Sequence, residues 1–236
     1  MSMTKIGVRR LLLTNAVILT FSSWLLGQNP QLRLKNAGRF PTVIFSSVKW
    51  NADPSYYSIA IDASGTATYQ SAPKGIADSG VAYTVEFQVS DRTRRIAFNL
   101  AQRLGYFAGD FGESRSTPNQ NKVHTLAYRY ESVNNQFTYS SSSDPDIEEL
   151  TSVFEELSQT FEFGRKLNDL ALHNRRGIPS QLQSMQEKAD RHALRDLPAL
   201  LPILRELASD TGLDPAVRKQ AATLIAMASR SSQAFQ

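Results

Sequence analysis

A stretch in which apolar and polar side chains alternate places the strongest constraint on how this chain can fold. The apolar members are Val81, Tyr83, Val85, Phe87 and Val89. Side chains of a strand point alternately to opposite faces of a sheet, so a period of two residues predicts a strand with one face on a core and one face toward solvent. We therefore expect the covering layer on one face of the sheet only.

Further segments with strand composition form a predicted hairpin. Residues 42–50 are rich in β-branched and aromatic side chains, residues 56–63 alternate, and residues 66–70 resume strand composition. The intervening turn at residues 62–65 contains Gly65, which can adopt the positive φ that tight turns need.

A second predicted hairpin joins residues 122–130 to residues 136–140 through a turn around Asn134 and Asn135. Apolar residues at helical spacing within residues 90–105 predict a helix ahead of it, with Ser90 and Asp91 at its start. The order hairpin, strand, helix, hairpin predicts an α+β fold, an antiparallel sheet with helices packed on one face.

A long helix is predicted to begin at Asp144 and Pro145, an N-cap acceptor followed by a residue that needs no helical N–H. Its apolar stripe, which we expect to cover the sheet, is Ile147, Leu150, Phe154, Leu157 and Phe161. The basic pair and glycine at residues 175–177 predict its end. After Pro179 the pattern predicts helices only, with starts near Pro179, Leu197 and Pro215.

The N-terminus has the layout of a signal peptide. Lys5, Arg9 and Arg10 precede an apolar run over residues 11–26 that is shorter than the roughly 20 residues of a spanning helix. We expect cleavage after Gly27, with a retained anchor and a buried N-terminal helix as the alternatives. The protein is then exported, periplasmic or extracellular, and contacts a membrane only through an uncleaved signal segment.

These patterns divide the chain into four parts. They are a signal peptide at residues 1–27, a linker at 28–41, an α+β domain at 42–176 and a helical tail at 177–236. Three of the 26 Lys and Arg fall in the signal peptide, leaving 23 cations against 22 acids. A near-neutral mature chain lacks the basic excess that nucleic-acid binding requires.

The chain contains no cysteine, which excludes disulfides, thiol catalysis, cysteine-bound zinc and lipid attachment at a cysteine. The three histidines, His124, His173 and His192, have no metal-ligand spacing, and no catalytic or nucleotide-binding motif occurs. We predict no catalytic, cofactor-binding or metal-binding residue and no cofactor. His124 is interpreted as a hydrogen-bonded residue of an edge strand.

Three arginines crowd the start of the first predicted helix, where cations oppose the helix dipole. Arg92, Arg94 and Arg95 are therefore a candidate contact for an anion or an acidic partner, and the alternative is a solvated face with Asp91 as neighbour. The acids that open the long helix are assigned to capping rather than to calcium binding, and they are Asp144, Asp146, Glu148 and Glu149.

Most tyrosines fall on predicted strands: Tyr56, Tyr57, Tyr69, Tyr83, Tyr128, Tyr130 and Tyr139. Aromatic pairs stabilise sheets, which favours cross-strand packing. The alternative is an aromatic ligand surface on the uncovered face of the sheet.

Residues 150–167, LTSVFEELSQTFEFGRKL, and residues 57–65, YSIAIDASG, resemble an uncharacterised family of exported bacterial cell-envelope proteins. The resemblance spans nearly the whole mature chain and implies export, but no chemistry. The hairpin pattern Tyr-x-Ile-x-Ile-x-x-x-Gly-x-x-x-Tyr, which ends at Tyr69, is also similar to other envelope domains. Several of those carry cysteines near the first strand, and this chain has none.

Residues 200–210, LLPILRELASD, and residues 214–224, DPAVRKQAATL, resemble one helical pair of a HEAT repeat. A solenoid needs about three repeats to bury its core, so a single pair is expected to pack on the sheet domain or on another protein. A three-residue connection at residues 177–179 favours packing within the chain. Overall we expect a non-enzymatic exported module that binds another envelope protein or polymer, with a hydrolase assembled only in three dimensions as the alternative.

N-terminal sequencing of the exported protein tests the predicted signal peptide. We expect the mature chain to begin near Gln28, because the apolar run ends just before it. An intact Met1 in the exported fraction would contradict cleavage and favour the retained anchor.

Overall fold

Six strands form one antiparallel sheet in the computed structural model, which describes residues 39–72, 83–109, 111 and 121–233. The strands are β1 (Thr42–Lys49), β2 (Tyr56–Asp62), β3 (Thr66–Ala72), β4 (Tyr83–Gln88), β5 (Lys122–Tyr130) and β6 (Val133–Tyr139). Their order is β4-β3-β2-β1-β5-β6. The predicted signal peptide, most of the predicted linker, and Val81 and Ala82 lie outside the described residues.

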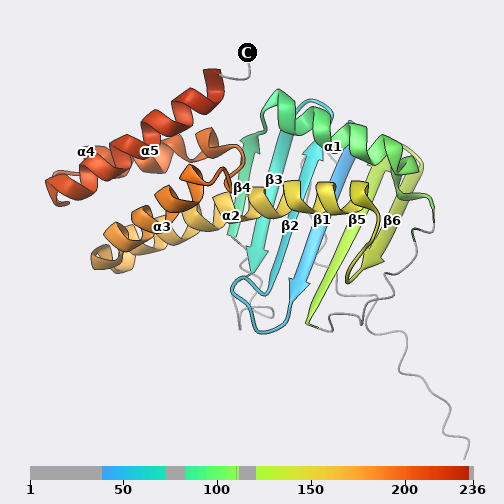
Figure 1. Ribbon diagram of the computed structural model, residues 1–236, viewed down its shortest axis with the longest axis horizontal. Coiled ribbons are helices and arrows are strands. Elements are labelled where there is room, and N and C mark those ends of the chain that lie inside the picture. The colour runs from blue at the N-terminus through green and yellow to red at the C-terminus, as the bar shows by residue number, and fades with distance from the viewer. Residues whose placement is uncertain (1–38, 73–82, 110, 112–120, 234–236) are drawn as a thin grey trace, which may run out of the picture. The chain divides into compact units, whose positions relative to one another are not determined.

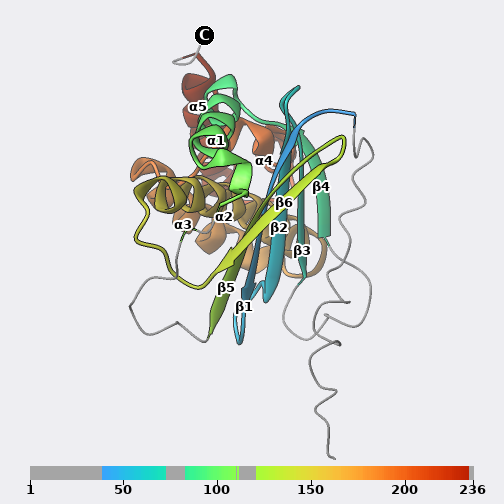
Figure 2. The same ribbon diagram turned by 90° about the vertical axis from the view of Figure 1, so that its right-hand side faces the viewer.

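Helices lie on one side of this sheet (Figures 1 and 2). They are α1 (Asp91–Arg103), η1 (Gly105–Phe107), α2 (Pro145–His173), η2 (Arg175–Gly177), α3 (Ile178–Asp190), η3 (Leu197–Leu200), α4 (Leu201–Ser209) and α5 (Pro215–Gln233). α1 and α2 cross the face of the sheet, whereas α3, α4 and α5 lie beyond β4. α1 carries the chain from the edge strand β4 back to β5, which pairs with β1. The predicted α+β class with helices on one face is confirmed.

The capping residues expected from the sequence begin both sheet-covering helices. Ser90 Oγ accepts a hydrogen bond from the amide of Thr93 at 3.2 Å at the start of α1. Asp144 Oδ1 accepts from the amides of Asp146 and Ile147 at the start of α2. These bonds satisfy amides that have no partner within the helix.

The turn of the second hairpin was misplaced by the sequence analysis. Asn134 and Asn135 lie inside β6, and the turn consists of Glu131 and Ser132, because Tyr130 pairs directly with Val133. Glu131 adopts the left-handed φ of 50° that two-residue hairpin turns need. In the first hairpin Gly65, with φ 90°, occupies the predicted turn.

Aromatic side chains join α2 to the middle of the sheet. The ring of Phe45 in β1 stacks on Phe154 with centroids 5.1 Å apart, and Tyr69 in β3 stacks on Phe161 at 5.3 Å. All four side chains are fully buried. Six of the seven strand tyrosines point to this covered face and only Tyr56 to the other, so cross-strand packing accounts for them better than an aromatic ligand surface.

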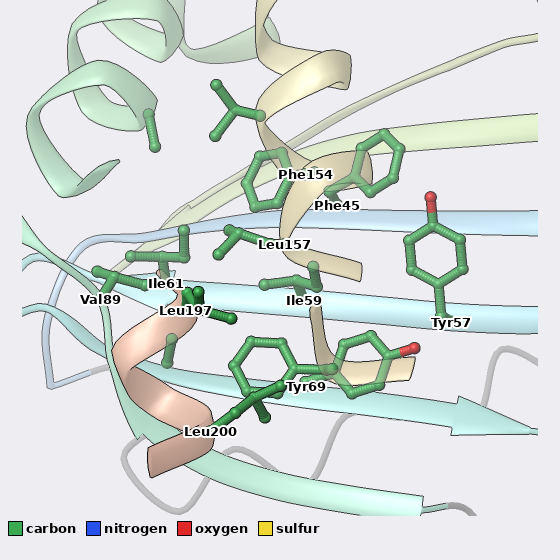
Figure 3. Close-up of a cluster of buried hydrophobic side chains, with 14 of the residues drawn as sticks. Phe45, Tyr57, Ile59, Ile61, Tyr69, Val89, Phe154, Leu157, Leu197 and Leu200 are labelled. Carbon is green, nitrogen blue, oxygen red and sulfur yellow. The ribbon is translucent and has the colours of Figure 1, made fainter. Parts of the chain in front are cut away.

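The helical tail shares this core. Leu197 and Leu200 of η3 belong to the same cluster of buried side chains as Ile59, Ile61 and Tyr69 (Figure 3). η3 approaches α2 so closely that a Cβ atom on Gly164 would lie 2.7 Å from Leu200. The predicted boundary between the α+β domain and the helical tail, at residues 176–177, therefore separates two parts of the chain that pack on one core. α4 and α5 pack on each other.

We expect Leu200→Asp to destabilise the sheet and the tail together, by several kcal/mol, because it buries a carboxylate without a partner in the shared core. Thermal unfolding followed by far-UV circular dichroism and by tryptophan fluorescence should give one transition at a lower temperature. The exposed Arg205 on α4 provides the control, since Arg205→Asp leaves the core unchanged. Two separate transitions would instead indicate a tail that folds independently.

Candidate functional site

A pocket of about 1030 Å³ lies at the end of β4, between α1, η3 and α5. This volume is at the upper end of the range that ligand sites occupy, about 300–1000 Å³. Its apolar wall is formed by side chains that include Val89, Leu194, Leu197 and Met227. Met227 is flexible and polarisable, which suits a surface that adapts to its ligand.

The segment between α3 and η3 forms one wall of the pocket and is held in an unusual conformation. His192 and Asp196 adopt left-handed φ values of 55° and 53°. Asp196 Oδ1 accepts a hydrogen bond from the amide of Ser90 at 3.2 Å, which ties this wall to the first turn of α1. Non-glycine residues in this region cost free energy and persist only where their surroundings fix them, often at binding sites.

An ion pair anchors the same segment to α2. Arg195 donates to Glu156 Oε2 at 2.8 Å, and the hydroxyl of Thr160 donates to the carbonyl of Arg195 at 2.8 Å. Both charges of the pair are partly buried. The wall is therefore fixed from two sides, by α1 and by α2.

Charged side chains of both signs surround the pocket. They are Asp91, Arg92, Asp190, Arg195, Asp196, Glu156 and Arg230. This mixture does not select an anion or a cation as ligand. Together with the apolar wall, it matches a ligand that combines apolar, acidic and basic groups, as a polypeptide does.

Of the three arginines that the sequence analysis selected, the structure brings only Arg92 to the pocket. Arg94 donates to Asp91 Oδ1 at 3.0 Å and to the carbonyl of Ala63 at 3.3 Å, so it holds α1 against the β2–β3 turn. Arg95 is exposed and lies outside the pocket lining.

The other concentration of polar groups is a row that crosses the sheet beneath α2. Cross-strand pairing places one residue of each strand in this polar row: Tyr83, Ser71, Tyr57, Ser47, His124 and Tyr139. The next row, which includes Phe45 and Ile59, is almost entirely apolar. Buried polar groups cost free energy unless they find partners, so α2 has to supply them.

Polar side chains on one side of α2 face this row, at spacings of alternately four and three residues, but leave the hydroxyls of Ser47 and Tyr57 without a hydrogen-bond partner. These side chains of α2 are Thr151, Glu155, Ser158, Glu162 and Arg165. Thr151 hydrogen-bonds to the hydroxyl of Tyr139 at one end of the row. A spacing of this kind keeps side chains on one face of a helix, so the polar side of α2 lies over the polar row.

Glu162 is the most completely satisfied of these partners. One carboxylate oxygen accepts from the hydroxyls of Tyr69 at 2.7 Å and Ser71 at 2.8 Å. The other accepts from Arg165 at 2.8 Å, and Arg165 also pairs with Asp53 at 3.2 Å. Each charge and hydroxyl of this network has a bonding partner. The network therefore has a structural role.

Three basic groups lie around one carboxylate oxygen of Glu155. Its Oε1 lies 2.6 Å from Lys122 Nζ, 3.6 Å from Lys49 Nζ and 3.9 Å from His124 Nε2. Burial alone would raise the pKa of Glu155, but the hydrogen bond and charge of Lys122 outweigh it and lower the pKa. Glu155 is therefore an anion that neutralises the lysines at this end of the sheet.

His124 is buried within the sheet rather than at its edge, contrary to the sequence analysis. β5 lies between β1 and β6, and the residue is 2% exposed. Its ring packs between Phe45 and Tyr139, and Nδ1 has no hydrogen-bond partner. Burial, together with the charge of Lys122, lowers the pKa of His124 from 6.5 to about 4, so the ring is neutral near pH 7.

Ser47, His124 and Glu155 are the residue types of a hydrolytic triad, but their geometry does not form one. Ser47 is the cross-strand neighbour of His124, yet its hydroxyl has no hydrogen-bond partner and the residue is 1% exposed. The His124–Glu155 separation of 3.9 Å exceeds a hydrogen bond. A substrate would have no access to this serine.

Sequence reasoning identified Arg92 but missed the rest of the pocket. Asp196 and Ser90 are 106 residues apart in the chain, and no local pattern connects them. The one available signal was Asp196 ahead of Leu197 and Pro198, which resembles the start of a helix and carries no information about a pocket.

No model of a protein family and no curated protein sequence matches the chain. Among the residues that the structure describes, no group of three or more His, Asp or Glu side chains could hold a metal ion. Within the same residues, none of the helices combines the length and apolar character that crossing a membrane requires.

The low pKa of His124 predicts a loss of stability in mild acid. Between pH 6.5 and 4 the unfolded chain binds the proton that the folded chain excludes, so the stabilisation is complete above pH 6.5 and is lost as the pH falls toward 4. We expect His124→Phe to reduce the difference in unfolding free energy between pH 7 and pH 4.5 by roughly 2–3 kcal/mol.

Urea unfolding at the two pH values measures this difference. The matched control is His173→Gln, because the side chain of His173 is 71% exposed. Equal pH dependence of the wild type and His124→Phe would show that protonation of His124 does not control acid stability.

Proposed function

We propose that the protein is an exported, non-catalytic binding module, and that its pocket holds a segment of another cell-envelope protein. The single observation that carries this proposal is the pocket between α1, η3 and α5, with its apolar wall and its charges of both signs. A polypeptide offers apolar side chains, acids, bases and backbone polar groups within a short length, and therefore fits such a lining.

The rigidity of the pocket wall supports a binding role. Asp196 and Arg195 fix the wall to α1 and α2 through their bonds to Ser90 and Glu156. A wall that is already ordered costs a ligand little conformational entropy on binding. The strained φ values of His192 and Asp196 are what such a fixed binding surface would require.

The polar groups near the pocket argue for binding rather than catalysis. Ser90 is committed to the helix cap, where its hydroxyl also bonds Thr93 Oγ1 at 3.0 Å. Arg195 and Glu156 neutralise each other. Of the side chains with the composition of a hydrolytic triad, Ser47 and His124 are closed to solvent.

Export rests on the predicted signal peptide, and the family resemblance points the same way. A stable fold without cysteine suits a compartment in which the redox state varies. The partner is then expected among envelope proteins, with nucleic acid excluded by the near-neutral charge of the mature chain.

A library of random 12-residue peptides displayed on phage tests this function. We expect the full chain to enrich peptides that combine apolar and charged residues, and Asp190→Trp to weaken their binding at least about tenfold by filling the pocket mouth. Isothermal titration with the enriched peptides measures the effect.

Glu187→Trp is the matched control, because Glu187 is an exposed acid one turn earlier on α3 and does not line the pocket. It should bind the peptides as the wild type does. If no peptide is enriched, or if both tryptophan variants bind equally well, the pocket is not a site for polypeptide segments.

A further inference from the structure

The outer edge of β4 carries backbone groups that the described sheet leaves unpaired. The amide of Val89 bonds to the carbonyl of Gly65 at 3.0 Å, so Val89, Phe87 and Val85 direct their backbone groups toward β3. In an antiparallel ladder the intervening residues point the other way. The N–H and C=O groups of Glu86 and Gln88 therefore face outward, and no described strand pairs with them.

The side chains of β4 are also incompletely covered. Tyr83, Val85 and Phe87 point to the helix-covered face and are only partly buried, unlike the fully buried Phe45 and Ile59 at the centre of the sheet. One more strand beside β4 would cover them. Exposed edges of this kind are templates for pairing with another chain.

α2 extends past this edge. Thr151 lies over β6, where it hydrogen-bonds to Tyr139, and Asn168 lies over β4 near the hydroxyl of Tyr83. The helix rises about 25 Å between these two residues, and five strand spacings amount to about 24 Å. α2 therefore advances by about three residues for each strand that it crosses.

Leu172 lies on α2 at about the distance at which the next strand beyond β4 would be. It follows Asn168 by about one helical turn and lies about five turns beyond Phe154, so it faces the sheet side. The side chain is 77% exposed, although Phe154 on the same face is fully buried. A seventh strand beside β4 would lie beneath Leu172.

The rest of the tail leaves this side of α2 open. η3 and the segment ahead of it contact α2 at Gly164 and Thr160. These positions are on the flank of α2 away from the row that includes Arg165 and Leu172. Figure 1 shows α2 running beyond β4 with the later helices beside it.

We propose that β4 accepts an extended segment of the partner protein as a seventh strand, which continues into the pocket. Gln88 belongs both to the outward edge of β4 and to the pocket lining, so the two surfaces are continuous. The inference rests on the proposed function for the identity of the ligand as a polypeptide, and it adds the mode of recognition, β-strand addition.

The surroundings define the chemistry of the segment. Alternate side chains would point toward Leu172 and the partly buried Val85, and these are apolar. The intervening side chains would face solvent next to the exposed Glu86, so a basic residue there is complementary in charge. The segment therefore alternates apolar residues with polar and basic ones.

A second copy of this chain fits the edge less well. It would bring its own α1 and α2 into the layer that the projecting end of α2 and α3 already fill. A single partner strand is the occupant that the geometry favours.

Glu86→Pro tests strand addition, because it removes an outward N–H while the ladder to β3 keeps its bonds. We expect the peptides enriched by the full chain to bind this variant at least about tenfold more weakly. Glu86→Ala keeps the N–H and should lose only the contribution of the basic residue. In the peptide, N-methylation at alternate positions should weaken binding, and methylation at the positions between should not.

The outcomes separate this inference from the proposed function. Loss of binding in both Asp190→Trp and Glu86→Pro supports the two together. If only Asp190→Trp loses peptide binding, the pocket function stands and strand addition is overturned. An N-methylation scan whose effect on binding does not alternate along the peptide would also overturn strand addition. Loss in Glu86→Pro alone keeps strand addition and overturns the pocket. Peptide binding that depends on neither residue, or no peptide binding, overturns both.

Hydrogen exchange and sedimentation address the other occupants. In the free full chain the amides of Glu86 and Gln88 should exchange rapidly and become protected by the peptide. Protection without peptide would mean that another part of the chain already pairs with the edge, which overturns the proposal. A wild-type dimer that Glu86→Pro converts to a monomer would assign the edge to a second copy instead.

Discussion

The contact between α2 and the sheet has to satisfy polar groups that lie inside the core. Tyr69 and Ser71 donate to one oxygen of Glu162, and Arg165 balances its charge. A helix shifted by one residue would rotate by about 100° and leave these hydroxyls without an acceptor. Because an unsatisfied buried donor costs more than a lost apolar contact of similar size, this polar network fixes the position of α2 along the sheet.

The fixed position of α2 determines where the tail can lie. α2 has 29 residues, and its length of about 44 Å far exceeds the width of a six-stranded sheet, about 24 Å between the outer strands. Its last turns therefore have no strand beneath them. η3 packs on the flank of α2 at Gly164, and the segment ahead of η3 reaches the first turn of α1. The pocket is the space that this arrangement encloses.

Sequence patterns predicted the features that depend on neighbouring residues. The alternation of β4, the caps Ser90 and Asp144, and the apolar stripe of α2 are local, and the structure confirms them. The turn near Asn134 was misplaced, because pairing along the whole hairpin outweighed local turn preference. Burial of His124 depends on β5 entering the sheet between β1 and β6, and the pocket depends on contacts between distant segments, neither of which has a local signal.

A ligand in the pocket would touch elements from both sides of the predicted boundary at residues 176–177. Ser90 and Val89 come from the α+β domain, while Leu197 and Met227 come from the tail. Such a ligand binds only the docked arrangement, so binding adds to the free energy that holds the tail in place. Leu197 and Leu200 already insert into the sheet core without a ligand. Core packing is therefore the common cause of the docked tail and of the preformed pocket wall. Its free energy keeps His192 and Asp196 in their strained conformations.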